Sequence, residues 1–120
     1  MRNFRELNVW ERSHRLALET YRITRSFPTD ERFGLTSQLR RAAASVPANI
    51  AEGCGRSTEP DLARFCDIAM GSATETEYHL LLAHDLQYIP TEVYEKADRE
   101  LDQIKRMLNR FTQHIRKNCQ

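Results

Sequence analysis

Residues 91–118 read TEVYEKADRELDQIKRMLNRFTQHIRKN and show the most regular pattern in the chain. Apolar side chains recur there at alternating steps of three and four residues, at Tyr94, Ala97, Leu101, Ile104, Leu108, Phe111 and Ile115. That spacing places all seven on one side of an α-helix. Thr91 is the expected N-cap, with Glu92 and Glu95 near the positive end of the helix dipole. The stretch predicts a long amphipathic helix that packs in a bundle.

Three breaks divide the rest of the 120 residues into three further helical segments. The breaks fall at residues 27–30, 53–57 and 87–91, where Gly, Pro or polar residues gather. No segment alternates with period two, so we expect no sheet. Four helices joined by short loops predict a single all-α domain over residues 1–120, an antiparallel up-down-up-down four-helix bundle. Pro47 lies inside the second helix, which we expect to be kinked there.

Local composition adds three expectations about packing. Gly53 and Gly55 should end the second helix with a positive φ. Around Gly71, the small residues from Ala69 to Ala73 should let another helix backbone approach closely. The first helix has apolar residues on two sides, which suits contact with a second subunit.

Composition favours a folded domain outside the membrane. Hydrophobic residues make up 40% and charged residues 29% of the chain, as in globular domains. The longest aliphatic run, residues 80–83, is far too short to span a bilayer, so we expect no membrane partner. The first residues lack the apolar core of a signal peptide, and the cytoplasm is the expected location. Three cysteines without a CxxC spacing argue against a disulfide framework or a zinc site.

The net charge of +1 hides a segregation of charge along the chain. Residues 1–57 hold 10 basic and 6 acidic side chains, residues 58–100 hold 3 and 10, and residues 101–120 hold 5 and 1. In an up-down bundle the two basic segments meet at one end. We expect that end to gather Arg2, Arg5, Arg12, Arg56, Arg106, Arg110, Arg116 and Lys117.

Two stripes of cations are the candidate nucleic-acid-binding residues. They are Arg5, Arg12, Arg15 and Arg22 along the first helix, and Arg106, Arg110 and Lys117 along the fourth. Because the arginine fork binds phosphate well, the stripes predict contact with RNA or DNA backbones. Solvated surface charge is the plain alternative. No aromatic platform interleaves these arginines, so the pattern does not indicate base stacking.

The sequence carries no pattern typical of an enzyme or of a cofactor site. It lacks a nucleophile elbow, a Walker loop and a dinucleotide fingerprint. Helical di-iron sites need two Glu-x-x-His motifs, and only Glu11 with His14 fits. We therefore expect His14 in the core or at an interface, and we predict no catalysis, no metal and no cofactor.

Several motifs resemble those of one bacterial family. They are Phe4-x-x-Leu7-x-Val9-Trp10, Phe33-Gly34-Leu35-x-x-Gln38-x-Arg40-Arg41-Ala42-Ala43, Ser45-Val46-Pro47-Ala48-Asn49-Ile50-Ala51-Glu52-Gly53, Ala69-x-Gly71-Ser72 and Glu75-x-Glu77-x-x-Leu80. The chain resembles four-helix-bundle proteins encoded in intervening sequences of 23S ribosomal RNA genes. It is similar, more distantly, to the accessory variability determinant of diversity-generating retroelements.

The resemblance implies a homopentameric barrel of four-helix bundles with no established enzymatic activity. It also implies nucleic-acid association for some members, and a reverse transcriptase as a partner of the retroelement relatives. For this chain we predict a non-catalytic scaffold or adaptor that forms a pentameric ring and binds RNA or DNA through its arginines. A protein-interaction module without nucleic-acid binding, whose arginines make intersubunit ion pairs, is the alternative.

Polar residues of these motifs form a second candidate set. Its members are Gln38, Arg40, Arg41, Asn49, Glu52, Ser72, Glu75 and Glu77. The spacing places most of the second-helix members broadly on one side of that helix. The two glutamates of the third helix are candidate partners for the two arginines. The set predicts a polar network that fixes helix register or a subunit interface, and a ligand site at Arg41 and Glu52 is the alternative.

Overall fold

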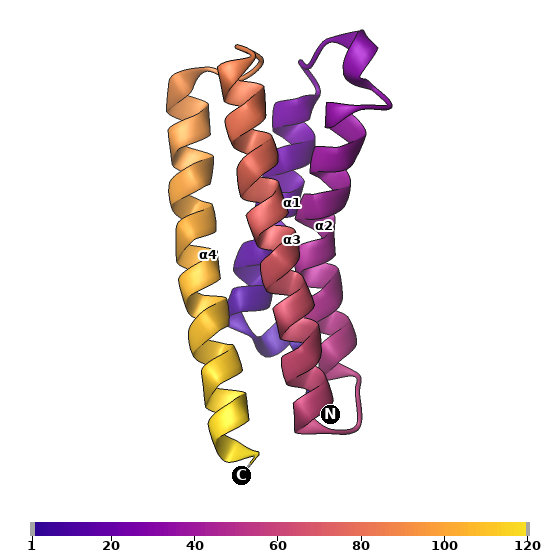
Figure 1. Ribbon diagram of the computed structural model, residues 1–120, viewed down its shortest axis with the longest axis vertical. Coiled ribbons are helices and arrows are strands. Elements are labelled where there is room, and N and C mark those ends of the chain that lie inside the picture. Colours follow the sequence, from indigo (N-terminus) through magenta and orange to yellow (C-terminus); the bar gives the residue numbers. More distant parts are fainter. Residues whose placement is uncertain (1, 120) are drawn as a thin grey trace.

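A computed structural model describes residues 2–119, and all regular structure in that range is helical. Four α-helices carry the fold: α1 (Asn8–Thr24), α2 (Leu35–Cys54), α3 (Glu59–Asp85) and α4 (Thr91–Asn118). Two short 3-10 helices, η1 (Phe4–Glu6) and η2 (Thr29–Glu31), precede α1 and α2. The predicted all-α, four-helix class is confirmed, and Figure 1 shows the helices aligned along the long axis of the molecule.

Helices that follow one another in the chain run in opposite directions. Near the end of α1 and the start of α2, the Arg40 guanidinium donates to Thr24 Oγ1 at 2.7 Å. The end of α2 lies against the start of α3, where Gly53 approaches Leu62. The start of α1, the α2–α3 loop and the end of α4 therefore share one end of the bundle (Figure 1).

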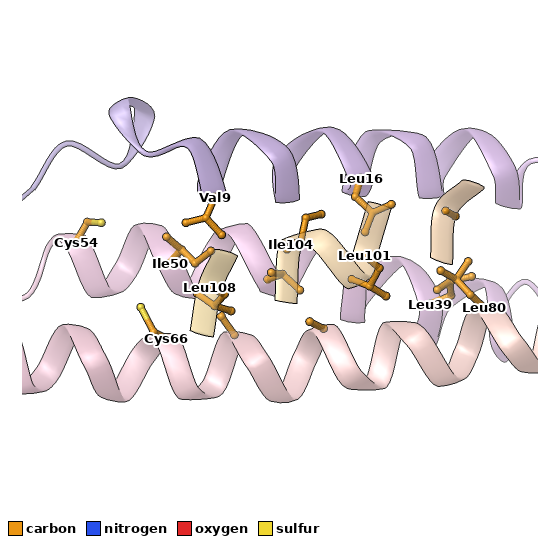
Figure 2. Packing of buried hydrophobic residues seen from close by; sticks show 14 of the residues in the cluster. Val9, Leu16, Leu39, Ile50, Cys54, Cys66, Leu80, Leu101, Ile104 and Leu108 are labelled. Atoms are coloured by element: carbon orange, nitrogen blue, oxygen red, sulfur yellow. The ribbon is translucent and has the colours of Figure 1, made fainter. Parts of the chain in front are cut away.

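The core runs along the middle of the bundle, between all four helices. Among the largest aliphatic side chains with 1% exposure or less are Leu39, Ile50, Leu80, Leu101, Ile104 and Leu108. Figure 2 shows them facing the interior together with Val9 and Leu16 of α1. Full burial of such a side chain contributes about 1.5–3 kcal/mol. The seam predicted from residues 91–118 is thus the inward face of α4.

The helix pairs are not packed equally tightly. α2 and α3 have the most extensive contact, and α1 and α4 the least. A Cβ on Gly53 would lie 2.9 Å from both Leu62 Cδ1 and Phe65 Cβ, so glycine is what lets α2 and α3 meet there. The close approach expected around Gly71 is wrong for this residue, because a Cβ there would have no atom within 4 Å. Gly71 lies on the exposed side of α3.

Helix ends differ in two details from the expectations. Thr91 is the first residue of α4 and not its cap, because Pro90 already adopts the extended conformation that an N-cap needs (φ −59°, ψ 147°). No glycine within residues 2–119 has a positive φ, and Gly55 caps α2 with φ −84°. α2 continues through Pro47 without interruption, and the kink there stays a prediction.

Two further features concern the membrane and the thiols. Across residues 2–119, no helix combines the length and the apolar character that a bilayer crossing requires. Cys54 and Cys66 are buried free thiols, whereas Cys119 is exposed. Burial raises the pKa of Cys66 to about 11, so this thiol stays protonated at neutral pH.

Candidate functional site

Arg5 lies in η1 and not on α1 as predicted, so the α1 stripe is the name used here for Arg12, Arg15 and Arg22 alone. Arg12 is the most firmly held cation of this stripe. Its Nε donates to Glu100 Oε1 at 2.6 Å, and its Nη2 donates to Glu100 Oε2 at 3.0 Å and to Gln103 Oε1 at 2.6 Å. Hydrogen bonding from this guanidinium holds the pKa of Glu100 below its ordinary value. Arg12 therefore ties α1 to α4 and does not present a free cation to phosphate.

Arg15 and Arg22 also have carboxylate partners, both within α1. Arg15 Nη2 lies 2.6 Å from Glu11 Oε1, and Arg22 Nη2 lies 2.6 Å from Glu19 Oε2. Water screens these pairs, because each of the four side chains exposes roughly half of its surface or more. Such pairs contribute about 0.3–0.5 kcal/mol each. The α1 stripe is therefore locally neutralised, although breaking the pair of Arg15 with Glu11 or of Arg22 with Glu19 requires little free energy.

The cations of α4 are less occupied. Arg106 Nε lies 2.9 Å from Asp102 Oδ2. Arg110 and Lys117 are exposed, and neither has a carboxylate partner among residues 2–119. Arg99 is likewise exposed and has no carboxylate partner within residues 2–119. The sequence interpretation missed Arg99, although its step of seven to Arg106 was a visible signal.

We call Arg99, Arg106, Arg110 and Lys117 the α4 stripe. Steps of seven, four and seven residues keep them on one side of the helix. At 1.5 Å of rise per residue, the stripe is about 27 Å long. It lies on the side of α4 opposite the buried seam of Leu101, Ile104 and Leu108, so it faces outward.

The expected basic end is largely neutralised. Five of its eight cations hold carboxylates, namely Arg2 with Glu59, Arg12 with Glu100, Arg56 with Asp61, Arg106 with Asp102 and Arg116 with Asp67. Hydrogen bonds from Arg56 and Arg64 also lower the pKa of Asp61. Of the eight, only Arg5, Arg110 and Lys117 lack a carboxylate partner within residues 2–119. The end carries separate free cations, not a continuous basic patch.

An aromatic stack lies beside Arg5, where the sequence pattern indicated no aromatic platform among the arginines. Arg5 Cζ lies 4.6 Å from the Phe4 ring centroid, and Phe4 lies 4.8 Å from Trp10. Trp10 stacks on His14 at 4.9 Å with an interplanar angle of 9°. His14 is exposed, so its expected place in the core is wrong, and a place at an interface stays a prediction. The signal that was missed is the i, i+4 spacing of Trp10 and His14.

The predicted polar network does not form within residues 2–119 of one chain. Each of its members that has a partner bonds to a different residue outside the set or in its own helix. Arg40 holds Thr24 and lies over the Tyr21 ring at 4.7 Å. Glu75 contacts His79, Glu77 accepts from Lys105, and Asn49 donates to the Ser45 carbonyl, at 3.0, 2.9 and 2.8 Å respectively. Neither glutamate meets Arg40 or Arg41 within the described residues, so the network does not fix register inside one chain.

The remaining members lie on the outer face of α2 and α3. Gln38, Arg41 and Glu52 are exposed, and their side chains have no hydrogen-bond partner within residues 2–119. Ser72 is half-buried on α3. Arg41 and Glu52 lie on one face of α2, and both are free to pair with charged residues of another chain. Their role at a subunit interface stays a prediction.

Other titratable groups do not converge on a centre. Residues 2–119 hold no group of three or more His, Cys, Asp or Glu side chains placed to bind a metal ion. His79 is buried with its Nε2 at Glu75 and its Nδ1 without a partner among the described residues. Burial, together with the neighbouring carboxylates of Glu77 and Asp102, raises the pKa of Asp98.

The fold and its surface define a class of protein: a small helical bundle whose candidate site is a set of cations along its outside. The chain belongs to the 23S rRNA-intervening sequence protein family, whose family model matches residues 5–110. The resemblance found in the motifs is thereby confirmed. No curated protein matches the chain.

A solved structure supports the same assignment. The chain is similar to the crystal structure of a protein of unknown function from the S23 ribosomal protein family of Bacteroides thetaiotaomicron. The TM-score is 0.80 and the sequence identity 26%, and the match covers 88% of this chain and 95% of that one. The two chains therefore share the helical bundle over nearly all of their lengths.

Proposed function

We propose that this chain is a non-catalytic cytoplasmic scaffold or adaptor that forms a pentameric ring and binds the phosphate backbone of RNA or DNA through its α4 stripe. The observation that carries the proposal is the stripe itself, in which Arg99, Arg110 and Lys117 are exposed and lack carboxylate partners within residues 2–119. The pentameric ring is what the family resemblance implies.

The physical basis of the binding is counterion release. Each phosphate that a cation neutralises frees a condensed counterion, so affinity falls steeply as salt rises. A ring repeats the stripe of every subunit, which multiplies the contacts along one nucleic acid. Cations that follow a backbone carry no base-reading pattern, so the binding favours shape over sequence.

Fluorescence anisotropy tests the proposal directly. Labelled duplex DNA and structured RNA are titrated with the wild-type protein at about 50 and about 200 mM salt, a range over which a multi-phosphate contact loses orders of magnitude in affinity. We expect binding that weakens steeply with salt, and weakens further in the triple variant Arg99→Ala/Arg110→Ala/Lys117→Ala. An absence of binding at the lower salt would rule the function out, and light scattering of the same sample measures the subunit number.

The alternative is a protein-interaction module whose arginines pair between subunits. The observation that favours it is the exposed pair of Arg41 and Glu52 on α2, which have no partner inside the described chain. In that case Arg41→Ala lowers the mass measured by light scattering, while nucleic acid is not bound at any salt. An assembly that keeps its mass and its stability in Arg41→Ala excludes an interface role for this residue.

A further inference from the structure

A groove follows the seam between α1 and α4, the least tightly packed helix pair. Its main part has a volume of about 660 Å³. A second part of about 310 Å³ continues it toward the α3–α4 loop, and the two share Glu19, Arg22, Ile23 and Val93. On α1 the groove extends from Arg12 to Ile23, which corresponds to about 17 Å of helix, and Ser26 in the turn after α1 continues it.

The floor of this groove is apolar. Leu16 and Ile23 line it from α1, and Val93 and Ala97 line it from α4. Val93 exposes 37% of its surface and Ile23 is half-buried, so a part of this floor is in contact with water. A partner that covers the floor would remove apolar surface from water, which stabilises the complex by about 25 cal/mol for each Å² buried.

The rim of the groove is net positive. The residues that line the main part include four cations and two carboxylates, and the cations are Arg12, Arg15, Arg22 and Lys96. Lys96 is exposed and has no carboxylate partner among residues 2–119. The ion pairs of Arg15 and Arg22 are solvent-screened, so these guanidinium groups exchange partners at little cost. Arg12 stays with Glu100 and closes one end of the groove.

We propose that this groove binds an amphipathic helix of a protein partner, with an apolar stripe flanked by acidic residues. A helix of about 14 residues matches the length of the groove. Its apolar residues at i, i+3 or i+4 and i+7 would pack on Ile23 and Val93, as helices do in hydrophobic grooves. Its carboxylates would pair with Lys96, and with Arg15 and Arg22 in exchange for Glu11 and Glu19. The inference goes beyond the nucleic-acid contact of α4 and does not depend on it.

The test uses a designed helical peptide with leucines on one face and glutamates beside them. Two control peptides replace the glutamates by lysines or the leucines by glutamines. We expect anisotropy at about 50 mM salt to show binding of the glutamate peptide to the full chain, and binding at least tenfold weaker for both controls. Equal binding of the lysine peptide, or no binding of the glutamate peptide at about 1 mM, would overturn the proposal.

Substitutions in the chain locate the peptide. Val93→Glu puts a charge on the floor, and it should fold because position 93 lies in the first turn of α4, where a carboxylate suits the helix dipole. Leu81→Glu is the matched control, since Leu81 is 41% exposed on α3 and outside the groove. We expect Val93→Glu to weaken peptide binding at least tenfold and Leu81→Glu to leave it unchanged.

Two further readouts separate this proposal from the others. Nucleic-acid binding should be the same in Val93→Glu and in the wild type, so the two functions fail independently. The subunit number from light scattering should also be unchanged in Val93→Glu. A loss of subunits in this variant would mean that a second copy of the chain covers the groove, and would overturn the assignment to a separate partner.

Discussion

The stripes on α1 and α4 both repeat cations, mostly arginines, at steps of three, four or seven residues, yet their cations have different surroundings. Arg12, Arg15 and Arg22 of α1 all hold carboxylates, and one of these, Glu100, comes from another helix. Within the α4 stripe only Arg106 has a carboxylate partner among residues 2–119. A cation pattern in a sequence therefore gives the position of charges on a helix, whereas carboxylates of the same helix and, for Arg12, the docking of α1 on α4 decide which charges remain available to a ligand.

The largest expected effect separates Arg12 from its counterpart Arg110. Arg12→Ala removes the hydrogen bonds to Glu100 and Gln103, and should lower the free energy of unfolding by about 1–2 kcal/mol. Arg110→Ala should change the free energy of unfolding by less than about 0.5 kcal/mol, because the Arg110 side chain is solvated and holds no carboxylate within residues 2–119. Urea denaturation of both variants measures the difference. Equal effects would mean that Arg12 does not tie α1 to α4.

The next effect concerns pH. The folded pKa of Glu100 lies below its unfolded value, so this carboxylate stabilises the fold above the unfolded pKa and stops doing so as pH falls through the folded pKa. Glu100→Gln should cost about 1 kcal/mol at pH 7, since part of the pair is screened by water.

Unfolding of wild type and Glu100→Gln at pH 7 and at about pH 3 checks this prediction. The difference between the two proteins should shrink as Glu100 becomes protonated in the wild type. Asp102→Asn is the control on the exposed pair with Arg106, and it should show little dependence on pH. A gap between wild type and Glu100→Gln that stays constant would refute the role of the ionised pair.

The smallest effect is expected within the α1 stripe. Arg15→Ala and Arg22→Ala each remove one exposed intrahelical pair and should lower the free energy of unfolding by no more than about 0.5 kcal/mol. Urea midpoints with an unchanged slope measure it. A decrease in the free energy of unfolding as large as that of Arg12→Ala would show that these pairs stabilise the fold. Arg15 and Arg22 could then not exchange their carboxylate partners easily for those of a bound helix.

Much of the fold could be predicted because helical periodicity is local. The seam of residues 91–118 is recognisable from neighbours three and four residues apart, and its aliphatic members Leu101, Ile104, Leu108 and Ile115 are all buried. A close approach of another helix was expected around Gly71, whereas the glycine at the close contact between α2 and α3 is Gly53. Small size marks where contact is possible, but the facing helix, here Leu62 and Phe65 opposite Gly53, decides where it occurs.

The candidate site was less predictable, because some of its contacts join residues that are far apart in the sequence. The pairs of Arg15 with Glu11 and of Arg106 with Asp102 span four residues, and their spacing was visible in the sequence. The partner of Arg12 is 88 residues away, and only the docking of α1 on α4 brings it near. The groove depends on the same docking, since it exists only where α1 and α4 fail to close.

The central claim is that the α4 stripe, not the α1 stripe, binds nucleic acid, and a matched pair of double variants tests it most directly. The salt dependence of duplex binding is measured by anisotropy for the wild type, for Arg110→Ala/Lys117→Ala and for Arg15→Ala/Arg22→Ala. The slope of log affinity against log salt is negative, and each lost phosphate contact reduces its magnitude by about 0.9. We predict a slope whose magnitude is smaller by about 2 or more for the α4 double variant and an unchanged slope for the α1 double variant. A reduced slope in the α1 variant with an unchanged slope in the α4 variant would contradict the account.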